Sequence, residues 1–231
     1  MTQSCAVTAD SLRMKVFGCE ECTDIVHFRR PPHGGPFYKF PPVIGAQGNA
    51  PLLFIGINPR RSHTNRCLHD WLVNSPGAFE QLAKNRDQNA EPYIAPDGPE
   101  EHYRCHAIVV EEVFAKGSAF ESSAAATELF LCASKGMPVS FDTLKRKPCV
   151  CAARYLLDVI KLVQPRVIVS VGDTVNEHLA QHFSNMISVP IVFMQHPKYL
   201  YGMSTSEKVR RLQPTINKLR ERFSGLISGR T

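Results

Sequence analysis

The chain has 231 residues, of which 43% are hydrophobic and 21% charged, which suits one folded domain and excludes a disordered protein. It contains no apolar run of about 18 residues and no signal-peptide block near its start, so it excludes a membrane-spanning helix. We therefore expect a cytoplasmic protein. The net charge of +6 favours a polyanionic partner only mildly, because an ordinary soluble surface also accounts for it.

The first third of the chain predicts an amphipathic opening, an irregular leader and a buried strand. Residues 1–18 form the opening, and residues 27–51 are rich in Pro and Gly. The run from Leu52 to Ile57 is apolar without polar alternation, which is typical of a parallel strand covered on both faces.

The middle of the chain predicts fewer regular elements. Residues 74–86 carry a capping Ser and an early Pro and predict a helix, whereas residues 87–105 are polar and predict a long loop. The run from Ile108 to Phe114 predicts a short apolar element of undefined type. Glu128 to Cys132, ELFLC, predicts a second buried strand.

The last third of the chain alternates regularly between helix and strand patterns. The helices are expected at 151–163, 174–183 and 205–226, and the strands at 167–171 and 189–194. Pro214 lies inside the final helix and predicts a kink or a second helix start. The four apolar strands, separated by helices, predict a three-layer α/β/α sandwich around a mainly parallel four-stranded sheet.

In such a sheet, ligands bind at the carboxyl ends of the strands. The motif GINP stands at the end of the first strand. Gly56 allows close approach to the backbone, Ile57 completes the strand, Asn58 offers an amide, and Pro59 suits the first turn of a helix. The alternative is that Asn58 is a helix cap and nothing more.

A second motif, QHPKYLYG, follows the last strand. His196 comes directly after the strand, and Lys198, Tyr199 and Leu200 lie on the loop behind it. Basic and aromatic residues on one loop suit phosphate contact and base stacking. A histidine at a strand end is otherwise most often a hydrogen-bonded structural residue.

The cysteines form a third pattern. Cys19 and Cys22 form a CxxC pair, and Cys132, Cys149 and Cys151 lie far downstream. Four thiolates would make a site for tetrahedral zinc or an iron–sulfur cluster. Buried free thiols are the alternative.

Together these motifs resemble the uracil-DNA glycosylase superfamily, most closely its iron–sulfur branch, the family-4 and family-5 enzymes. The GINP version of the first motif is similar to that of the mismatch-specific thymine/uracil glycosylases. In chain order the matching segments are CEEC at Cys19 and Cys22, VIGAQGNAPLLFIG, GINP, LVNSPGAFEQL, the cysteine Cys132, PRVIVSVG and HPKYL.

The resemblance implies a monomeric, single-domain DNA glycosylase, with residues 1–51 as a leader and residues 52–231 as the α/β core. It implies that Asn58 positions the attacking water and that His196 donates to a base carbonyl, after the base has been flipped out of DNA. It further implies a structural 4Fe-4S cluster, with zinc as the alternative. The phosphate-contacting residues would be Lys145, Arg146, Lys147 and Lys198, with Tyr199 or Leu200 filling the gap in the base stack.

Three features depart from the family pattern. Glu128 stands where family-4 enzymes have an asparagine that reads the uracil edge. The fourth thiolate, beside Cys19, Cys22 and Cys132, is expected to be Cys149 from the gap length, with Cys151, which the helix alignment favours, as the alternative. The segment with His102, followed by His106, has no counterpart.

Two other functions stay open. One is a nucleic-acid-binding or damage-sensing member of the same fold that has lost catalysis, which the Glu128 replacement favours. The other is an unrelated α/β enzyme acting on a nucleotide, with GINPRR as its anion site.

Overall fold

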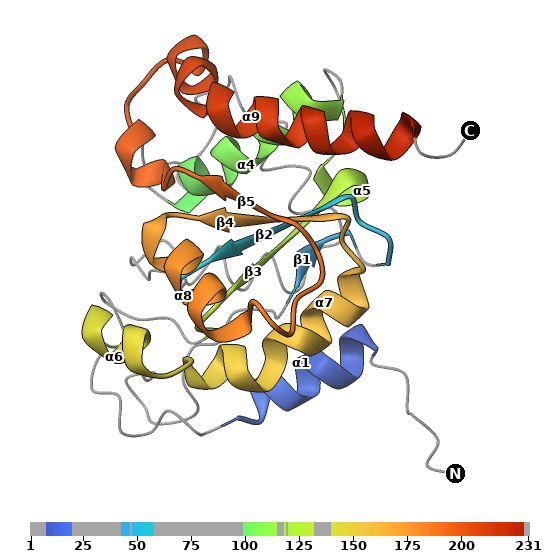
Figure 1. Ribbon diagram of the computed structural model, residues 1–231, viewed down its shortest axis with the longest axis vertical. Coiled ribbons are helices and arrows are strands. Elements are labelled where there is room, and N and C mark those ends of the chain that lie inside the picture. Colours follow the sequence, from blue (N-terminus) through green and yellow to red (C-terminus); the bar gives the residue numbers. More distant parts are fainter. Residues whose placement is uncertain are drawn as a thin grey trace.

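The computed structural model describes residues 8–19, 43–46, 48–57, 99–114, 118, 120–131 and 140–228. Within them, a sheet lies between two layers of helices (Figure 1). The expected α/β/α sandwich is thereby confirmed. In chain order the elements are α1 (Ala9–Phe17), β1 (Ile44–Gly45), β2 (Leu52–Gly56), α4 (Pro99–Phe114), α5 (Phe120–Ser123), β3 (Ala124–Glu128), α6 (Phe141–Arg146), the π-helical turn η2 (Ala152–Leu156), α7 (Leu157–Val163), β4 (Val167–Val171), α8 (Asp173–Phe183), β5 (Ile191–Met194), the 3-10 turn η3 (Pro197–Leu200) and α9 (Thr205–Ser228).

The sheet has the strand order β1-β3-β2-β4-β5. The strands β3, β2, β4 and β5 are parallel, as the uniform apolar runs predict, and the two-residue β1 adds an antiparallel edge to β3. β1 lies in the Pro/Gly-rich leader, so part of that segment joins the core. The carboxyl ends of four strands therefore meet at one edge of the sheet, which we call the carboxyl edge.

Alternate residues of β2 face opposite helical layers. Leu53 and Ile55 pack with α1, α6, η2, α7 and α8, which we call the α8 layer. Leu52 and Phe54 pack with α4, α5 and α9, the α4 layer. All five residues of β2 are buried, which is the physical reason why this strand shows no polar alternation.

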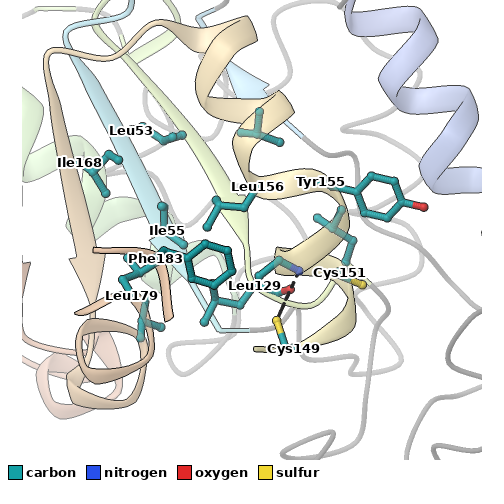
Figure 2. Packing of buried hydrophobic residues seen from close by; sticks show 14 of the residues in the cluster. Leu53, Ile55, Leu129, Cys149, Cys151, Tyr155, Leu156, Ile168, Leu179 and Phe183 are labelled. Atoms are coloured by element: carbon teal, nitrogen blue, oxygen red, sulfur yellow. Dashed lines mark hydrogen bonds between the residues drawn. The ribbon is translucent and has the colours of Figure 1, made fainter. Parts of the chain in front are cut away.

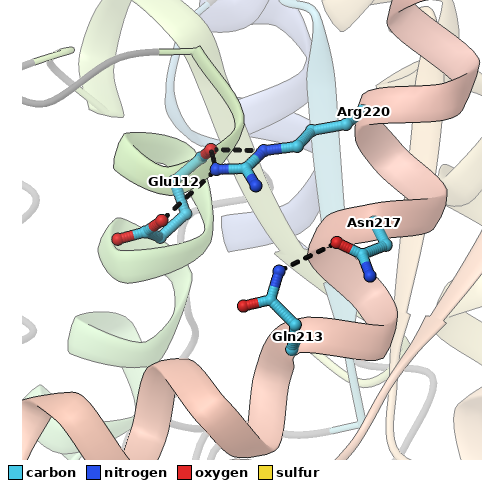
Figure 3. A network of polar contacts seen from close by, with 4 residues as sticks. All are labelled: Glu112, Gln213, Asn217 and Arg220. Atoms are coloured by element: carbon cyan, nitrogen blue, oxygen red, sulfur yellow. Dashed lines mark hydrogen bonds and ion pairs between the residues drawn. The ribbon is translucent and has the colours of Figure 1, made fainter.

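Polar contacts (Figure 3) and one aromatic contact join α4 to α9 at the surface of the α4 layer. The Arg220 guanidinium donates from Nε to the Glu112 carbonyl at 2.9 Å and approaches the Glu112 carboxylate at 3.3 Å. The rings of Phe114 and Phe223 lie 5.0 Å apart. Along α9 itself, the side chain of Gln213 donates to that of Asn217. These contacts fix how α4 lies across the sheet.

Two expectations about element bounds are wrong, and of the two alternatives for Pro214 the second helix start is excluded. The second strand is Ala124–Glu128, so the run that follows Glu128 lies beyond it. Residues 99–105 belong to α4, which begins at Pro99 and continues through Phe114. A proline in the first turn leaves no helical hydrogen bond unmade, which explains the start. The final helix continues past Pro214 without a second start.

Candidate functional site

The carboxyl edge brings together the ends of β2, β3, β4 and β5. Gly56 pairs with Glu128 at the last position of the β2–β3 register. Beyond it, the Leu129 N–H donates to the Gly56 carbonyl at 2.9 Å. On the other side of the sheet, the Gly172 N–H donates to the Met194 carbonyl at 2.8 Å, which holds the end of β5 beside that of β4. Residues that follow these strands consequently lie at the same edge.

Glu128 folds its carboxyl group across Gly56. A β-carbon placed on Gly56 would overlap Glu128 Oε2 and would lie 2.7 Å from Glu128 Cδ. The expectation was that Gly56 opens the backbone to a ligand. The structure gives that space to the side chain of Glu128 instead. Gly56 is therefore needed for the position of Glu128.

His196 lies at the end of β5 and caps η3. Its Nδ1 accepts a hydrogen bond from the Lys198 N–H at 3.1 Å. Because Nδ1 is the acceptor, the proton of the neutral ring is on Nε2, which makes Nε2 a donor. Gly172 has φ +89, and a β-carbon there would lie 3.2 Å from His196 Cβ and Cδ2. Glycine at this position lets the imidazole pack against the end of β4.

Two histidines of α4 complete the cluster, one helical turn apart. The His106 ring stacks on Phe54 of β2, with centroids 4.3 Å apart and planes inclined by 10°. The His102 ring lies 4.7 Å from that of His106 and 5.5 Å from that of His196. Tyr103 lies 5.7 Å from His106. We call Glu128, His102, His106 and His196 the edge cluster.

Burial removes charge from three members of the edge cluster, Glu128, His102 and His106, at neutral pH. It raises the pKa of Glu128 to about 8, so that this carboxyl group is mostly protonated at pH 7. Burial, followed by the charge of His196, lowers the pKa of His102 to about 3. Burial, then His102 and His196, also lowers the pKa of His106 well below its ordinary value. Burial, then the Glu128 charge, raises that of Tyr103.

The sequence pattern did not predict that His102 and His106 would lie at this edge of the sheet. They are four residues apart, which places both on one face of a helix, but residues 87–105 were expected to be a loop. The signal that could have revealed them was Pro99 followed by two glutamates, a pattern typical of a helix start. Ile57 lies next to Gly56 at the end of β2 and is half-buried in the α8 layer.

Expected DNA-contacting residues lie on both sides of the carboxyl edge. In Figure 1, α6 and η3 lie at the end of the molecule to which the strand arrows point. The residues Lys145, Arg146 and Lys147 are exposed at the end of α6. On η3, Lys198 is exposed and its Nζ lies 4.8 Å from the centre of the Tyr199 ring, which is 53% exposed. Leu200 is fully buried in the α4 layer, so it cannot fill a gap in a base stack.

The end of α6 is held by side chains of α8. The His178 Nδ1 and the His182 Nε2 donate to the Leu144 carbonyl at 3.0 and 2.8 Å, and Gln181 donates to the Lys145 carbonyl. The three basic side chains therefore extend from an anchored backbone.

Three of the five cysteines considered for a metal site lie in the described residues, all in the α8 layer. Cys149 Sγ donates to the Leu129 carbonyl at 3.0 Å (Figure 2). Burial, followed by the Cys19 side chain, raises the pKa of Tyr155 above its ordinary value, and Cys151 acts in the same direction. Cys19 and Cys151 thus lie near the same tyrosine. Among the described residues, no group of three or more His, Cys, Asp or Glu side chains could hold a metal ion.

Several expected site residues fall on parts of the chain that are not described. These are Asn58, Pro59, Cys22 and Cys132, together with the helix expected at 74–86. Within the described ranges, no helix has the length and apolarity that a membrane crossing requires. No protein-family model matches the chain, and no curated protein sequence matches it significantly.

Proposed function

We propose that the protein is a DNA N-glycosylase that hydrolyses the bond between deoxyribose and a deaminated or damaged base flipped out of DNA. The observation that carries the proposal is the carboxyl edge itself. There, the Nε2–H donor of His196 and the buried, neutral carboxyl of Glu128 lie at the carboxyl ends of β5 and β3, two parallel strands of one sheet. Uncharged hydrogen-bonding groups at this edge suit a base better than they suit a phosphate.

In the proposed reaction, water adds its oxygen to C1′ of the deoxyribose as the bond from C1′ to the base breaks. The bond's electron pair leaves with the base. The water loses one proton, which neutralises the departing base, so the products are the free base and a deoxyribose with a hydroxyl group at C1′. His196 Nε2–H donates to a carbonyl oxygen of the departing base, where negative charge develops. Asn58 holds the attacking water; an amide is too weak a base to remove its proton, so it acts by positioning.

The flanking cations hold the DNA in this proposal. Lys145, Arg146 and Lys147 on the α8-layer side and Lys198 on the α4-layer side contact phosphates around the flipped nucleotide. Tyr199 takes the vacated place in the stack, because it is exposed and Leu200 is not.

A four-thiolate site fits the chain in part. Cys19 and Cys151 share the surroundings of Tyr155, whereas Cys149 is hydrogen-bonded to the Leu129 carbonyl. This favours Cys151 over Cys149 as the fourth ligand beside Cys19, Cys22 and Cys132. A 4Fe-4S cluster, or alternatively zinc, would tie the leader to the α8 layer and supply no step of the hydrolysis. Iron and sulfide analysis of anaerobically purified protein distinguishes the two.

The test is a base panel on oligonucleotides. Uracil, hypoxanthine and xanthine are placed in single and double strands, and base release is measured for the parent, Asn58→Ala and His196→Ala. We expect each variant to lose at least about 100-fold in rate while DNA affinity stays within a few fold. Gln213→Ala, a change on α9 that removes only a contact along that helix, is the matched control.

Base release at the parent rate by both variants would contradict the assigned roles. Salt-dependent DNA binding by the parent without release of any base would favour the damage-sensing alternative. Absence of DNA binding would favour an unrelated nucleotide enzyme.

A further inference from the structure

The edge cluster contains polar atoms that nothing in the described structure satisfies. Among the described residues, His102 Nε2, both ring nitrogens of His106 and Glu128 Oε2 are buried without a hydrogen-bond partner. His106 is 2% exposed and Glu128 9% exposed. Buried polar atoms are nearly always paired with protein or water, so a group of such atoms on two adjoining elements indicates a site where a partner binds.

The side chains of Glu128, His102 and His106 offer hydrogen bonds without charge. A neutral imidazole has one N–H donor and one acceptor nitrogen, and a protonated carboxyl has one O–H donor and a carbonyl acceptor. A buried anion such as a phosphate needs cations or several aligned N–H groups. The edge cluster instead suits an uncharged partner with its own alternating donors and acceptors.

The arrangement of these groups also suits a flat partner. The His106 ring is held nearly parallel to Phe54, so its plane is fixed. The Glu128 carboxyl group lies against Gly56, in the space that a larger side chain would occupy. Tyr103, which responds to the charge of Glu128, links the carboxyl group to the two histidines of α4. A heterocyclic ring presents its donors and acceptors in one plane along one edge.

We propose that His102, His106 and Glu128 form one uncharged hydrogen-bonding set that binds the edge of a neutral heterocyclic base, with Glu128 acting as a protonated carboxylic acid. This inference rests on the proposed function and names how its substrate is recognised. A protonated carboxyl pairs with an adjacent N–H and C=O of a lactam as a side-chain amide does. An ionised carboxylate only accepts, so it would repel the C=O of that edge.

The state of Glu128 depends on the groups around it. The titratable groups that ring contacts and charge interactions place around Glu128 are His102, Tyr103 and His106 on α4 and His196 at the start of η3. The adjoining end of β2 brings no titratable side chain. As pH rises through about 8, Glu128 ionises and the donor is lost. Base binding should therefore weaken above that pH.

The experiment measures binding of free bases to the full chain by ligand-observed NMR, which needs no catalysis. Uracil, hypoxanthine and xanthine are compared with orotate, a uracil that carries a carboxylate, and with inorganic phosphate. We expect at least one neutral base to bind between pH 6 and 7 and orotate and phosphate to bind at least about tenfold more weakly. Equal or tighter binding of orotate or phosphate would overturn the proposal.

Four variants locate the binding. Glu128→Gln keeps a donor and an acceptor, so it should bind within about threefold of the parent and lose the weakening above pH 8. Glu128→Ala and His106→Phe should each weaken binding at least about tenfold, because each removes partners of the ligand. Gln213→Ala should bind like the parent. Parent-like binding by Glu128→Ala and His106→Phe would overturn the proposal.

The outcomes separate this inference from the proposed function. Base binding that depends on Glu128 and His106, without base release from any DNA, would support the inference and contradict the glycosylase. Base release from DNA at the parent rate in both Glu128→Ala and His106→Phe would support the glycosylase and contradict the inference.

Discussion

Two buried histidines on opposite faces of the sheet differ in how their ring nitrogens are satisfied. On the α8 layer, His178 Nε2 accepts from the Cys149 N–H at 3.2 Å and Nδ1 donates to the Leu144 carbonyl at 3.0 Å. On the α4 layer, His106 has no hydrogen-bond partner at either nitrogen among the described residues. Both rings are 2% exposed. Burial alone therefore does not distinguish them, and the difference lies in the partners.

This difference indicates two roles for the same residue type. His178 joins the chain before η2 to the end of α6, which is a structural task completed within the protein. His106 keeps two polar atoms buried at the carboxyl edge, a cost that proteins retain mainly where a ligand or water completes the hydrogen bonds. Buried polar groups with hydrogen-bond partners inside the protein stabilise the fold, whereas buried polar groups without such partners indicate a candidate site.

The largest effect expected is on stability when each histidine is replaced by phenylalanine. His178→Phe leaves the Cys149 N–H buried without its acceptor, and should lower the free energy of unfolding by about 3 kcal/mol. His106→Phe keeps the stacking on Phe54 and removes two unpartnered atoms, so it should change stability by less than about 1 kcal/mol or increase it. Urea denaturation of both variants measures this. Equal losses would remove the distinction between the two clusters.

A smaller effect is expected from Glu128→Gln, and it depends on pH. Burial raises the folded-state pKa of Glu128 from 4.5 to about 8, so between these values the folded protein holds a proton that the unfolded chain releases. The parent therefore loses stability from this group as pH rises, and the glutamine variant does not. Between pH 5 and 7 the stability of the variant relative to the parent should rise by roughly 2 kcal/mol.

Denaturation curves at pH 5, 6 and 7 test this difference. Glu207→Gln, which alters an exposed ion pair on α9, is a control that should show little pH-dependent gain. A constant difference between the Glu128 variant and the parent across this range would mean that Glu128 is ionised in the folded protein.

The smallest effect expected concerns Gly56. In Gly56→Ala the new methyl group would displace the Glu128 carboxyl group, costing about 1–2 kcal/mol. In the Glu128→Ala background the same change meets no carboxyl group and should cost little. A double-mutant cycle by thermal denaturation gives the coupling energy. If the cost is the same in both backgrounds, another contact accounts for the need for glycine.

The fold class and most of the sheet could be predicted from the residue pattern alone. The uniform apolar runs of β2 and β4 predict strands buried on both faces, because a parallel sheet between two helical layers leaves no solvent-facing side. The same reasoning placed His196 after the last strand. β3 was misplaced because its three alanines carry a weak strand signal beside the more apolar run that follows, and pairing with β2 selected them.

The candidate site was only partly readable from the sequence. His196 stood out because it follows the last predicted strand, and Glu128 because it departs from the family pattern. Their place at one edge of the sheet depends on the strand order, in which β2 and β4 lie between β3 and β5. His102 and His106 joined them because α4 packs across β2, through the stacking of His106 on Phe54. Local pattern fixes which residues can form a strand or a helix. Which polar groups are left together without partners is decided by contacts between elements distant in the chain, and only the tertiary structure supplies these.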